Sequence, residues 1–357
     1  MFERLVFLNR FSWFRRFWLT IMELVHDEGS GRNWFGWLRT MRVPRSGGRV
    51  GVGALAVLLA FSTFVAITDG FIPTTAPVVA KETESRGAVA LALSRSIEAE
   101  REHGWMPNDL FWPTIFLSNY QNFQLGELQV WRRVTYQLRE HLSRVRTTDG
   151  INPRIDAANM ALNNDEFKWW LPSFEGRMEI AVNELRAYVH ERRATPLSPD
   201  SRDALRRADN LRYLIEDVAS AMGGMQDQLL RTLSPTHQPQ GEDGAPQQMQ
   251  AAPSDMETVG IFHAAGIFYH GKGEAYAALT ILEAVRIEYA DVLKRKNGIE
   301  LTDEAIFWLR EAIGLRPWFV LNSGRASIFA NHLDNFAAPF SLARAKVNSL
   351  IDVLKNG

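Results

Sequence analysis

The 357-residue chain contains no cysteine. This absence excludes a disulfide framework, catalysis by a thiolate and a metal site with cysteine ligands. A domain outside the cytoplasm can still fold without disulfides when its hydrophobic core is large enough. The sequence also lacks a phosphate-binding P-loop, a GxGxxG dinucleotide motif and a GxSxG nucleophile motif. No motif therefore assigns a reaction to the chain.

Strict alternation of apolar and polar residues, which is typical of half-buried strands, is missing as well. Apolar residues recur instead at spacings of three and four, the period of a helix with one buried face. One such stripe comprises Leu128, Trp131, Val134, Leu138, Leu142 and Val145. We therefore predict an all-α fold, with helices over residues 85–103, 119–145, 174–188, 205–233, 258–296, 303–315 and 327–354.

A short turn with Pro196 and Pro199 joins the helix over 174–188 to the helix over 205–233. Helices joined by short loops usually pack side by side in opposite directions. We therefore expect these two helices to form an antiparallel hairpin within a helical bundle.

The stretch from Val50 to Thr68 has no charged residue and is bounded by Arg49 and Asp69. As a helix with a rise of about 1.5 Å per residue it would measure about 28 Å, close to the hydrocarbon thickness of a bilayer. Backbone polar groups in lipid must be satisfied within the segment, which favours a helix. The sequence predicts one transmembrane helix over residues 50–68. Within it, Ala56 and Ala60 form a small-xxx-small pair that would suit a dimer of spans.

The charges beside this span are unevenly distributed. Residues 1–49 carry nine arginines, no lysine and four acidic residues, a net charge of 9 − 4 = +5, which leaves about −6 for the rest of the chain. Basic residues next to a span favour the cytoplasmic side. We expect an inner-membrane protein with a cytoplasmic N-terminus and a periplasmic C-terminal part. Cleavage of a signal peptide after Ala80 is the alternative, although that position lies well past the apolar run.

The chain divides into six parts on this interpretation. A cytoplasmic arm (1–49) and the span (50–68) lead into a stalk (69–84) that contains two prolines. The periplasmic domain follows, in two helical parts (85–233 and 257–357). Residues 234–256 separate these parts and are rich in proline and glutamine, so we expect a flexible linker there.

The N-terminal arm has an amphipathic pattern with aromatic and arginine side chains, which is typical of helices at a membrane surface. An aromatic face packed on a partner protein is the alternative. Nucleic-acid binding is not expected, because the outer part is acidic and the basic arm adjoins the membrane. The residues expected at the membrane surface are Phe7, Phe11, Phe14, Arg15, Arg16, Trp18, Trp34 and Trp37.

One set of side chains has a spacing suited to metal binding or acid–base chemistry. His263, His270 and Glu274 follow each other at offsets of 0, 7 and 11, which places them close to one line along a helix. A zinc site would need a further ligand, for which His332 and Asp334 are candidates. The alternative is a partly polar packing face with a local hydrogen bond. We expect no cofactor.

A second candidate is the segment from Gly104 to Asp109. Trp105, Asn108 and Asp109 together offer an aromatic ring and polar groups with which a sugar or peptide could be bound. The alternative is structural, because Pro107 followed by Asn108 and Asp109 is typical of a turn that caps a helix.

Several segments resemble an uncharacterised family of single-pass inner-membrane proteins of Gram-negative bacteria, known only as a domain of unknown function. The resemblance covers most of residues 85–355 and implies a membrane-anchored, mainly helical periplasmic protein, without any catalytic residue. The segments are GWMPND (104–109), SNYQNFQLG (118–126), WWLPSFEGRMEIAVNELRAYV (169–189), FYHGKGEAYAALTILEAV (268–285) and PWFVLNSGRASIFANHLDNFA (317–337).

Our leading hypothesis is an interaction or scaffold protein, or an accessory subunit of a membrane complex. Its partners would be the bilayer, a protein in the membrane or periplasm, or a second copy of the chain. The alternative is a metal-dependent enzyme or ligand-binding protein built on His263, His270 and Glu274. A third hypothesis is a sensor whose short cytoplasmic arm needs a separate output protein.

Overall fold

The computed structural model describes residues 72–73, 86–109, 118–143, 150–194, 207–233, 261–317, 320 and 331–356. These residues belong to one compact unit, 72–357, which is separate from residues 1–71. The predicted arm, span and linker, and the stalk apart from residues 72 and 73, lie outside the described residues. No helix among the described residues has the length and apolarity needed to cross a bilayer.

The described residues are mainly helical, with no strand among them, which confirms the all-α prediction. The helices are α5 (Ala88–His103), α6 (Ser118–Gln137), the π-helix η3 (Leu138–Leu142), α7 (Pro153–Leu162), α8 (Phe174–Ala194), α10 (Ala208–Leu233), α11 (Ile261–Glu288), α12 (Ala290–Arg295), α13 (Ile299–Gly314) and α14 (His332–Asn356).

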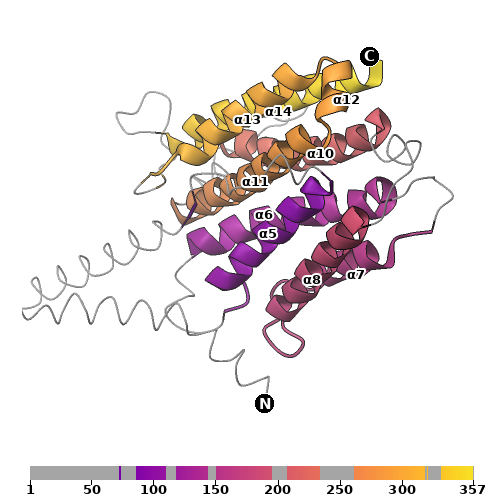
Figure 1. The fold of residues 1–357 in the computed structure, drawn as a ribbon. Coiled ribbons are helices and arrows are strands. Elements are labelled where there is room, and N and C mark those ends of the chain that lie inside the picture. Colours follow the sequence, from indigo (N-terminus) through magenta and orange to yellow (C-terminus); the bar gives the residue numbers. More distant parts are fainter. Residues whose placement is uncertain are drawn as a thin grey trace, which may run out of the picture. The chain divides into compact units, whose positions relative to one another are not determined.

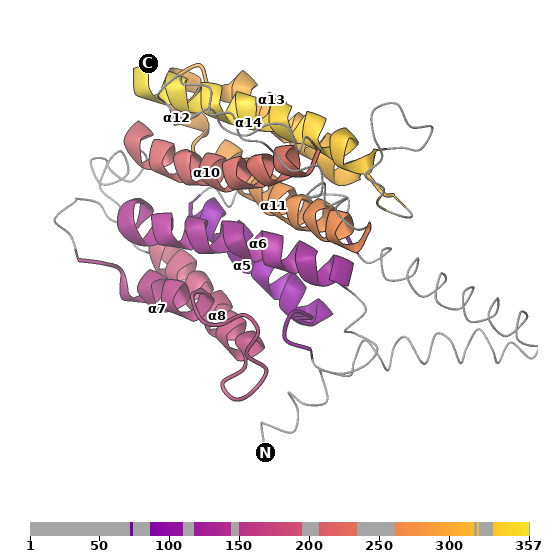
Figure 2. The ribbon, with the colours of Figure 1, turned by 180° about the vertical axis from the view of Figure 1, so that it is seen from behind.

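The longer helices stack in four layers of two (Figures 1 and 2). α7 and α8 form the first layer, α5 and α6 the second, α10 and α11 the third, and α13 and α14 the fourth. α11 is the central helix, because it packs against α5, α6, α10, α13 and α14. Its sequence is apolar on nearly all sides, as expected of a helix surrounded by others.

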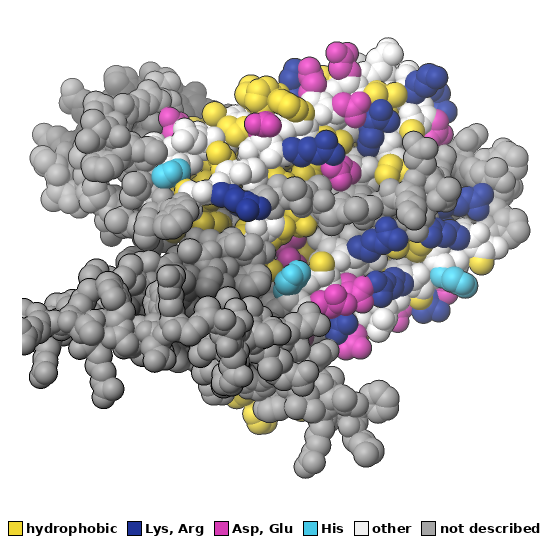
Figure 3. All heavy atoms as spheres, turned by 60° about the vertical axis from the view of Figure 1, so that its left-hand side comes forward, with side chains coloured by type: hydrophobic (Ala, Val, Ile, Leu, Met, Phe, Trp, Pro, Cys, Tyr) yellow, Lys and Arg dark blue, Asp and Glu magenta, His cyan; other side chains and the backbone are white. Residues whose placement is uncertain are grey.

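The apolar stripes predicted from the sequence form the core. On α6 and η3, the described members of the predicted stripe are all buried, and the same holds on α8 for Phe174, Met178, Ala181, Leu185 and Tyr188. Outside this core, basic and acidic side chains are interspersed over the described part of the face shown in Figure 3.

The expected hairpin of α8 and α10 is wrong. α8 packs against α5 and α7, whereas α10 packs against α14, α6 and α11, two layers away. The connection is the reason: α8 ends at Ala194 and α10 begins at Ala208, so 208 − 194 − 1 = 13 residues join them. A segment of this length reaches about 45 Å when extended, enough to bypass a layer.

α7 was not predicted, although its start carries a clear signal. The Asn152 side chain accepts hydrogen bonds from the backbone N–H groups of Arg154 (3.0 Å) and Ile155 (3.4 Å), and Pro153 occupies the first turn. An asparagine cap followed by proline is a common helix start. The predicted helix over 258–296 is also divided, into α11 and α12, at Tyr289.

The C-terminal end of α11 fastens the start of α5. The Glu288 carboxylate accepts hydrogen bonds from the backbone N–H groups of Gly87 (3.2 Å) and Val89 (3.0 Å), and forms a buried ion pair with Arg192 of α8 (3.2 Å). Gly87 has a φ of 71°, a backbone conformation that glycine adopts without strain. Three helices are thus joined at one charged, buried point.

Candidate functional site

The connection between α7 and α8, residues 163–173, exposes an unusual amount of apolar surface. We call it the aromatic loop. Phe167 is 55% exposed, Trp169 41%, Trp170 66% and Leu171 69%. The two indole rings lie edge to face with their centroids 5.3 Å apart. Contiguous exposed apolar side chains are typical of surfaces that contact another molecule.

The segment before α6 holds the aromatic loop from the interior. The indole Nε1 of buried Trp105 donates a hydrogen bond to the Glu166 carbonyl over 2.9 Å. The Nδ2 of buried Asn108 donates to the Lys168 carbonyl (3.1 Å) and to the Glu175 carboxylate (3.0 Å). These side chains satisfy backbone oxygens of the loop, so its apolar side chains are displayed on a fixed frame.

Arg132 of α6 holds the other side of the loop. Its guanidinium donates to the carbonyls of Leu162 (2.8 Å) and Asn164 (2.7 Å) and pairs with the Glu166 carboxylate (2.8 Å). The planar guanidinium presents several donors in fixed directions and therefore orders several acceptors at once. Arg132, Trp105 and Asn108 together form what we call the loop clamp.

The predicted ligand residues Trp105 and Asn108 thus lie inside the molecule as supports of the aromatic loop. The Trp105 ring packs against Phe174, with centroids 4.9 Å apart, and against Trp131 at 6.5 Å. Asp109 is half-buried in the turn, where its backbone N–H donates to the Met106 carbonyl. The predicted turn is present, but Asn108 holds the aromatic loop rather than a helix start, and a ligand role stays an untested prediction.

Sequence reasoning did not single out the exposed residues of the loop. A signal was present: Phe167, Trp169, Trp170 and Leu171 crowd into five positions, which fits neither the period of a helix nor that of a strand. Such a group next to a proline suggests apolar side chains on a loop rather than a core stripe.

A second group of interacting polar side chains surrounds a buried carboxyl pair, Glu100 of α5 and Glu127 of α6. Glu100 accepts hydrogen bonds from the Tyr120 hydroxyl (2.8 Å) and the Gln124 amide (2.9 Å). Glu127 accepts from the Ser96 hydroxyl (3.4 Å) and is hydrogen-bonded to Glu100. Both carboxyl groups are buried in the interior of the bundle.

The surroundings raise the pKa values of both carboxyl groups, but to different extents. Burial, the nearby charge of Glu100 and the hydrogen bond between the carboxyl groups raise the pKa of Glu127 well above its usual value. Burial also raises the pKa of Glu100, but the hydrogen bonds from Gln124 and Tyr120 oppose the shift. Both carboxyl groups are therefore harder to ionise than exposed ones, and the shift is stronger for Glu127.

The predicted metal set is only partly brought together. His270 Nε2 lies 3.3 Å from the Glu274 carboxylate and 3.3 Å from the Gln129 side-chain oxygen. His263 is exposed and lies two helical turns earlier on α11, about 10 Å away along the axis. Burial raises the pKa of Glu274, against the hydrogen bond from His270.

The proposed additional ligands, His332 and Asp334, lie in the first turn of α14. The backbone N–H of Asp334 donates to the Asn331 side chain, which caps that helix. Among the residues that the structure describes, no three histidine, cysteine, aspartate or glutamate side chains are arranged to hold a metal ion.

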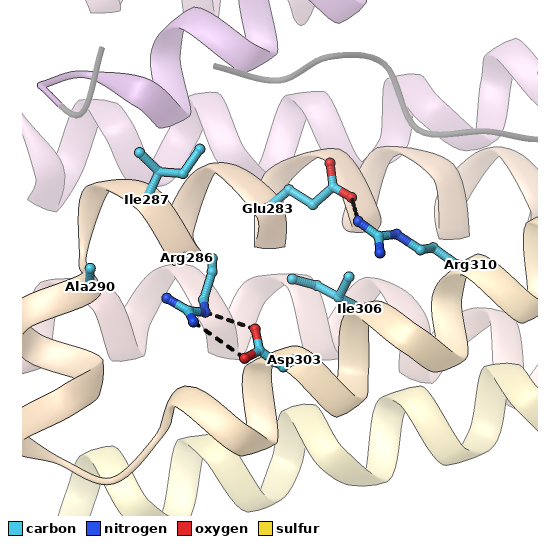
Figure 4. Close-up of a pocket in the computed structure, with 7 residues that line it drawn as sticks. All are labelled: Glu283, Arg286, Ile287, Ala290, Asp303, Ile306 and Arg310. Carbon is cyan, nitrogen blue, oxygen red and sulfur yellow. Dashed lines mark hydrogen bonds and ion pairs between the residues drawn. The ribbon is translucent and has the colours of Figure 1, made fainter. Parts of the chain in front are cut away.

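A shallow groove of about 590 Å³ lies between α11 and α13 (Figure 4). Apolar side chains alternate along it with two ion pairs, Arg286 to Asp303 (2.7 Å) and Arg310 to Glu283 (2.6 Å). Because each arginine that lines it is paired with a carboxylate, the groove does not present an unbalanced charge to a ligand.

Comparison with known proteins gives one family match. Residues 80–357 match the family described as "Uncharacterized protein conserved in bacteria (DUF2333)". No curated protein and no solved structure matches the chain. The matched range contains the whole four-layer helical stack, including the aromatic loop and the carboxyl pair.

Proposed function

The chain belongs to the uncharacterised bacterial family DUF2333, and from that premise we propose that it is a membrane-anchored interaction protein of the cell envelope. Residues 50–68 cross the inner membrane once, with the arm in the cytoplasm and the helical body in the periplasm. The body serves as a scaffold or as an accessory subunit of an inner-membrane complex. The description of this family names no reaction.

The sequence supports the anchor and its orientation. The run from Val50 to Thr68 is long enough for one crossing, and the arginine-rich segment before it favours the cytoplasm. These are sequence arguments, because the run lies outside the residues that the structure describes.

The observation that carries the interaction role is the clamped aromatic loop. A surface that is rigid before binding loses little conformational freedom when it meets a partner. Side-chain donors of Trp105, Asn108 and Arg132 fix the loop backbone, while Trp170 and Leu171 remain largely exposed. A soluble monomer with no partner would gain nothing from displaying these side chains in a fixed frame.

Affinity purification of the full chain from native membranes in mild detergent, after crosslinking, tests the proposal. We expect the same partner to be recovered in constant proportion. The double variant Trp170→Ser, Leu171→Ser should reduce recovery several-fold. The matched control Phe307→Ser removes another exposed aromatic side chain, on α13, and should leave recovery unchanged. Recovery of the wild-type chain alone would contradict the proposal.

A further inference from the structure

We propose that Gln124 couples the buried carboxyl pair to the aromatic loop, so that ionisation of the pair loosens the loop as the pH rises. The inference rests on the proposed function, because it concerns the regulation of the surface that carries that function. Gln124 is a positioning residue, since it acts on the loop through the loop clamp.

The fully buried side chain of Gln124 connects the carboxyl pair to the segment that follows α5. Its amide nitrogen donates hydrogen bonds to the Glu100 carboxylate (2.9 Å) and to the Gly104 carbonyl (2.9 Å). Its amide oxygen accepts a hydrogen bond from the backbone N–H of Met106 (2.9 Å). Both amide hydrogens are in use, so a displacement of the Glu100 carboxylate either breaks a hydrogen bond or moves Gln124.

The segment that Gln124 holds carries two members of the loop clamp. Trp105 lies between Gly104 and Met106, the two residues whose backbone groups bind Gln124, and Asn108 follows in the same turn. The side chains of Trp105 and Asn108 both donate hydrogen bonds to carbonyl groups of the aromatic loop. A shift of Gln124 therefore reaches the loop through residues that are joined to it by direct contacts.

The carboxyl pair supplies the element with two states that such a coupling requires. Burial raises the pKa of both carboxyl groups, and the negative charge of Glu100 raises that of Glu127 further. Ionisation of Glu100 alone strengthens the hydrogen bond from Gln124, because the acceptor then carries a charge. Ionisation of Glu127 as well places two negative charges side by side in the interior, and their repulsion favours separation of the two carboxylates. The loop is therefore held at low pH and loosened as the pH rises.

Titratable groups on three helices act on the pair: His103 on α5, Tyr120 on α6 and Tyr276 on α11. Burial raises the pKa of both tyrosines above the usual value, so both stay neutral up to pH 9. The charge of His103 lowers the pKa of Glu100. Because histidine commonly changes its charge between pH 5 and 8, a His103→Gln variant is needed as a control.

α8 and α11 bring further charged side chains to α5 and α6, and these form ion pairs of their own. The pairs are Glu179 with Arg101, Arg186 with Glu98, and Glu274 with His270. Glu274 also has a pKa raised by burial, so it titrates in the same direction as the carboxyl pair. The test therefore depends on variants of the pair itself and not on the pH response of the unaltered pair alone.

Electron paramagnetic resonance of the full chain in mild detergent measures the coupling. The chain has no cysteine of its own, so Leu171→Cys carries a single nitroxide on the loop. Phe307→Cys on α13 is the matched control, because both side chains are exposed, at 69% and 52%. Between pH 5 and 9 we expect the nitroxide at position 171 to become several-fold more mobile, while the mobility at position 307 stays constant.

Variants in the Leu171→Cys background assign the response to the pair and to Gln124. Glu127→Gln replaces a carboxyl group with a neutral amide and should abolish the pH response, whereas His103→Gln should preserve it. Gln124→Leu removes all three hydrogen bonds of the connecting side chain and should leave the nitroxide mobile at every pH. If Gln124→Leu does not fold, the comparison of Glu127→Gln with the parent chain decides.

The outcomes separate this inference from the proposed function, because loop mobility is measured without a partner. Constant mobility at position 171 between pH 5 and 9, or a pH response that persists in Glu127→Gln, overturns the coupling and leaves the interaction role intact. Equal changes at positions 171 and 307 also overturn it, since they report loosening of the whole helical body. A loop that responds as expected in a chain that recovers no partner contradicts the proposed function alone.

Discussion

Glu100 and Glu127 place two carboxyl groups beside each other in the interior. Two buried negative charges so close together would repel each other strongly, so one carboxyl keeps its proton. Tyr120 and Gln124 both donate to Glu100, and these hydrogen bonds oppose the rise of its pKa, so Glu100 is the easier of the two to ionise.

Glu127→Gln should change how the stability of the protein depends on pH. The pKa of Glu127 is raised in the folded state, whereas a glutamate in the unfolded chain has a pKa of about 4.3. The folded state therefore binds more protons above that pH, and the free energy of unfolding falls as the pH rises. One proton contributes about 1.4 kcal/mol per pH unit until the folded-state pKa is reached.

Chemical unfolding between pH 5 and 9 measures the effect. We expect the Glu127→Gln variant to lose less stability than the wild type over this range, because glutamine is neutral at every pH. Glu274 also has a raised pKa and adds a slope of the same sign, so the result is the difference between the two proteins. Glu102→Gln, at an exposed position of α5, is the control. Parallel pH profiles for wild type and Glu127→Gln would contradict a raised pKa of Glu127.

At the residue scale, the sequence shows which residue types are present but not which side chains contact each other. Glu100 and Glu127 are each one glutamate among many on helix-forming segments, and their pairing follows from how α5 and α6 lie together. His270 and Glu274 could be paired from the sequence, because they are one turn apart on a single helix. Contacts within a helix are predictable, whereas contacts between helices depend on the tertiary arrangement.

At the element scale, the tightest contact is the crossing of α6 and α11. A Cβ atom at Gly126 would lie 2.0 Å from the His270 carbonyl oxygen, and one at Gly273 would lie 1.9 Å from that of Phe123. Both obstacles are backbone atoms, so a side chain fits only if the helices separate. Glycine on both helices thus allows the backbones to touch, beside the carboxyl pair.

Gly273→Ala should destabilise the protein by about 3 kcal/mol or more, since overpacking costs about 1–3 kcal/mol even where side chains can adjust. Gly224→Ala on α10 is the matched control, because its Cβ meets nothing within 4 Å. Alanine also favours a helix over glycine by up to about 1 kcal/mol, so the control should be neutral or slightly stabilising. Thermal unfolding distinguishes the two, and equal midpoints would contradict this account of the crossing.

The elements themselves were largely predictable. The stripe from Leu128 to Leu142 is buried as its spacing indicates, and local capping chemistry at Asn152 and Pro153 would have given α7 as well. The expected hairpin failed because loop length alone does not determine a neighbour. α8 and α10 each bury an apolar stripe, but each does so against helices from other parts of the chain.

At the scale of the whole molecule, the chain combines a predicted span at 50–68 with a helical body that displays the clamped aromatic loop. The anchoring of this body by the span is our proposal. The span could be predicted because it is one continuous run, whereas the loop depends on Trp105 and Asn108, some 60 residues away. The family match covers the helical body, residues 80–357. The side of the membrane on which this body lies is the property to measure.

Labelling of single cysteines in intact spheroplasts tests the periplasmic placement of the body most directly. Because the chain has no cysteine of its own, a membrane-impermeant maleimide reports only the introduced thiol. The account predicts that Phe307→Cys is labelled as fully before lysis as after it, while Ser46→Cys in the arm is labelled only after lysis. Labelling of Phe307→Cys only after lysis would contradict a membrane-anchored body outside the cytoplasm.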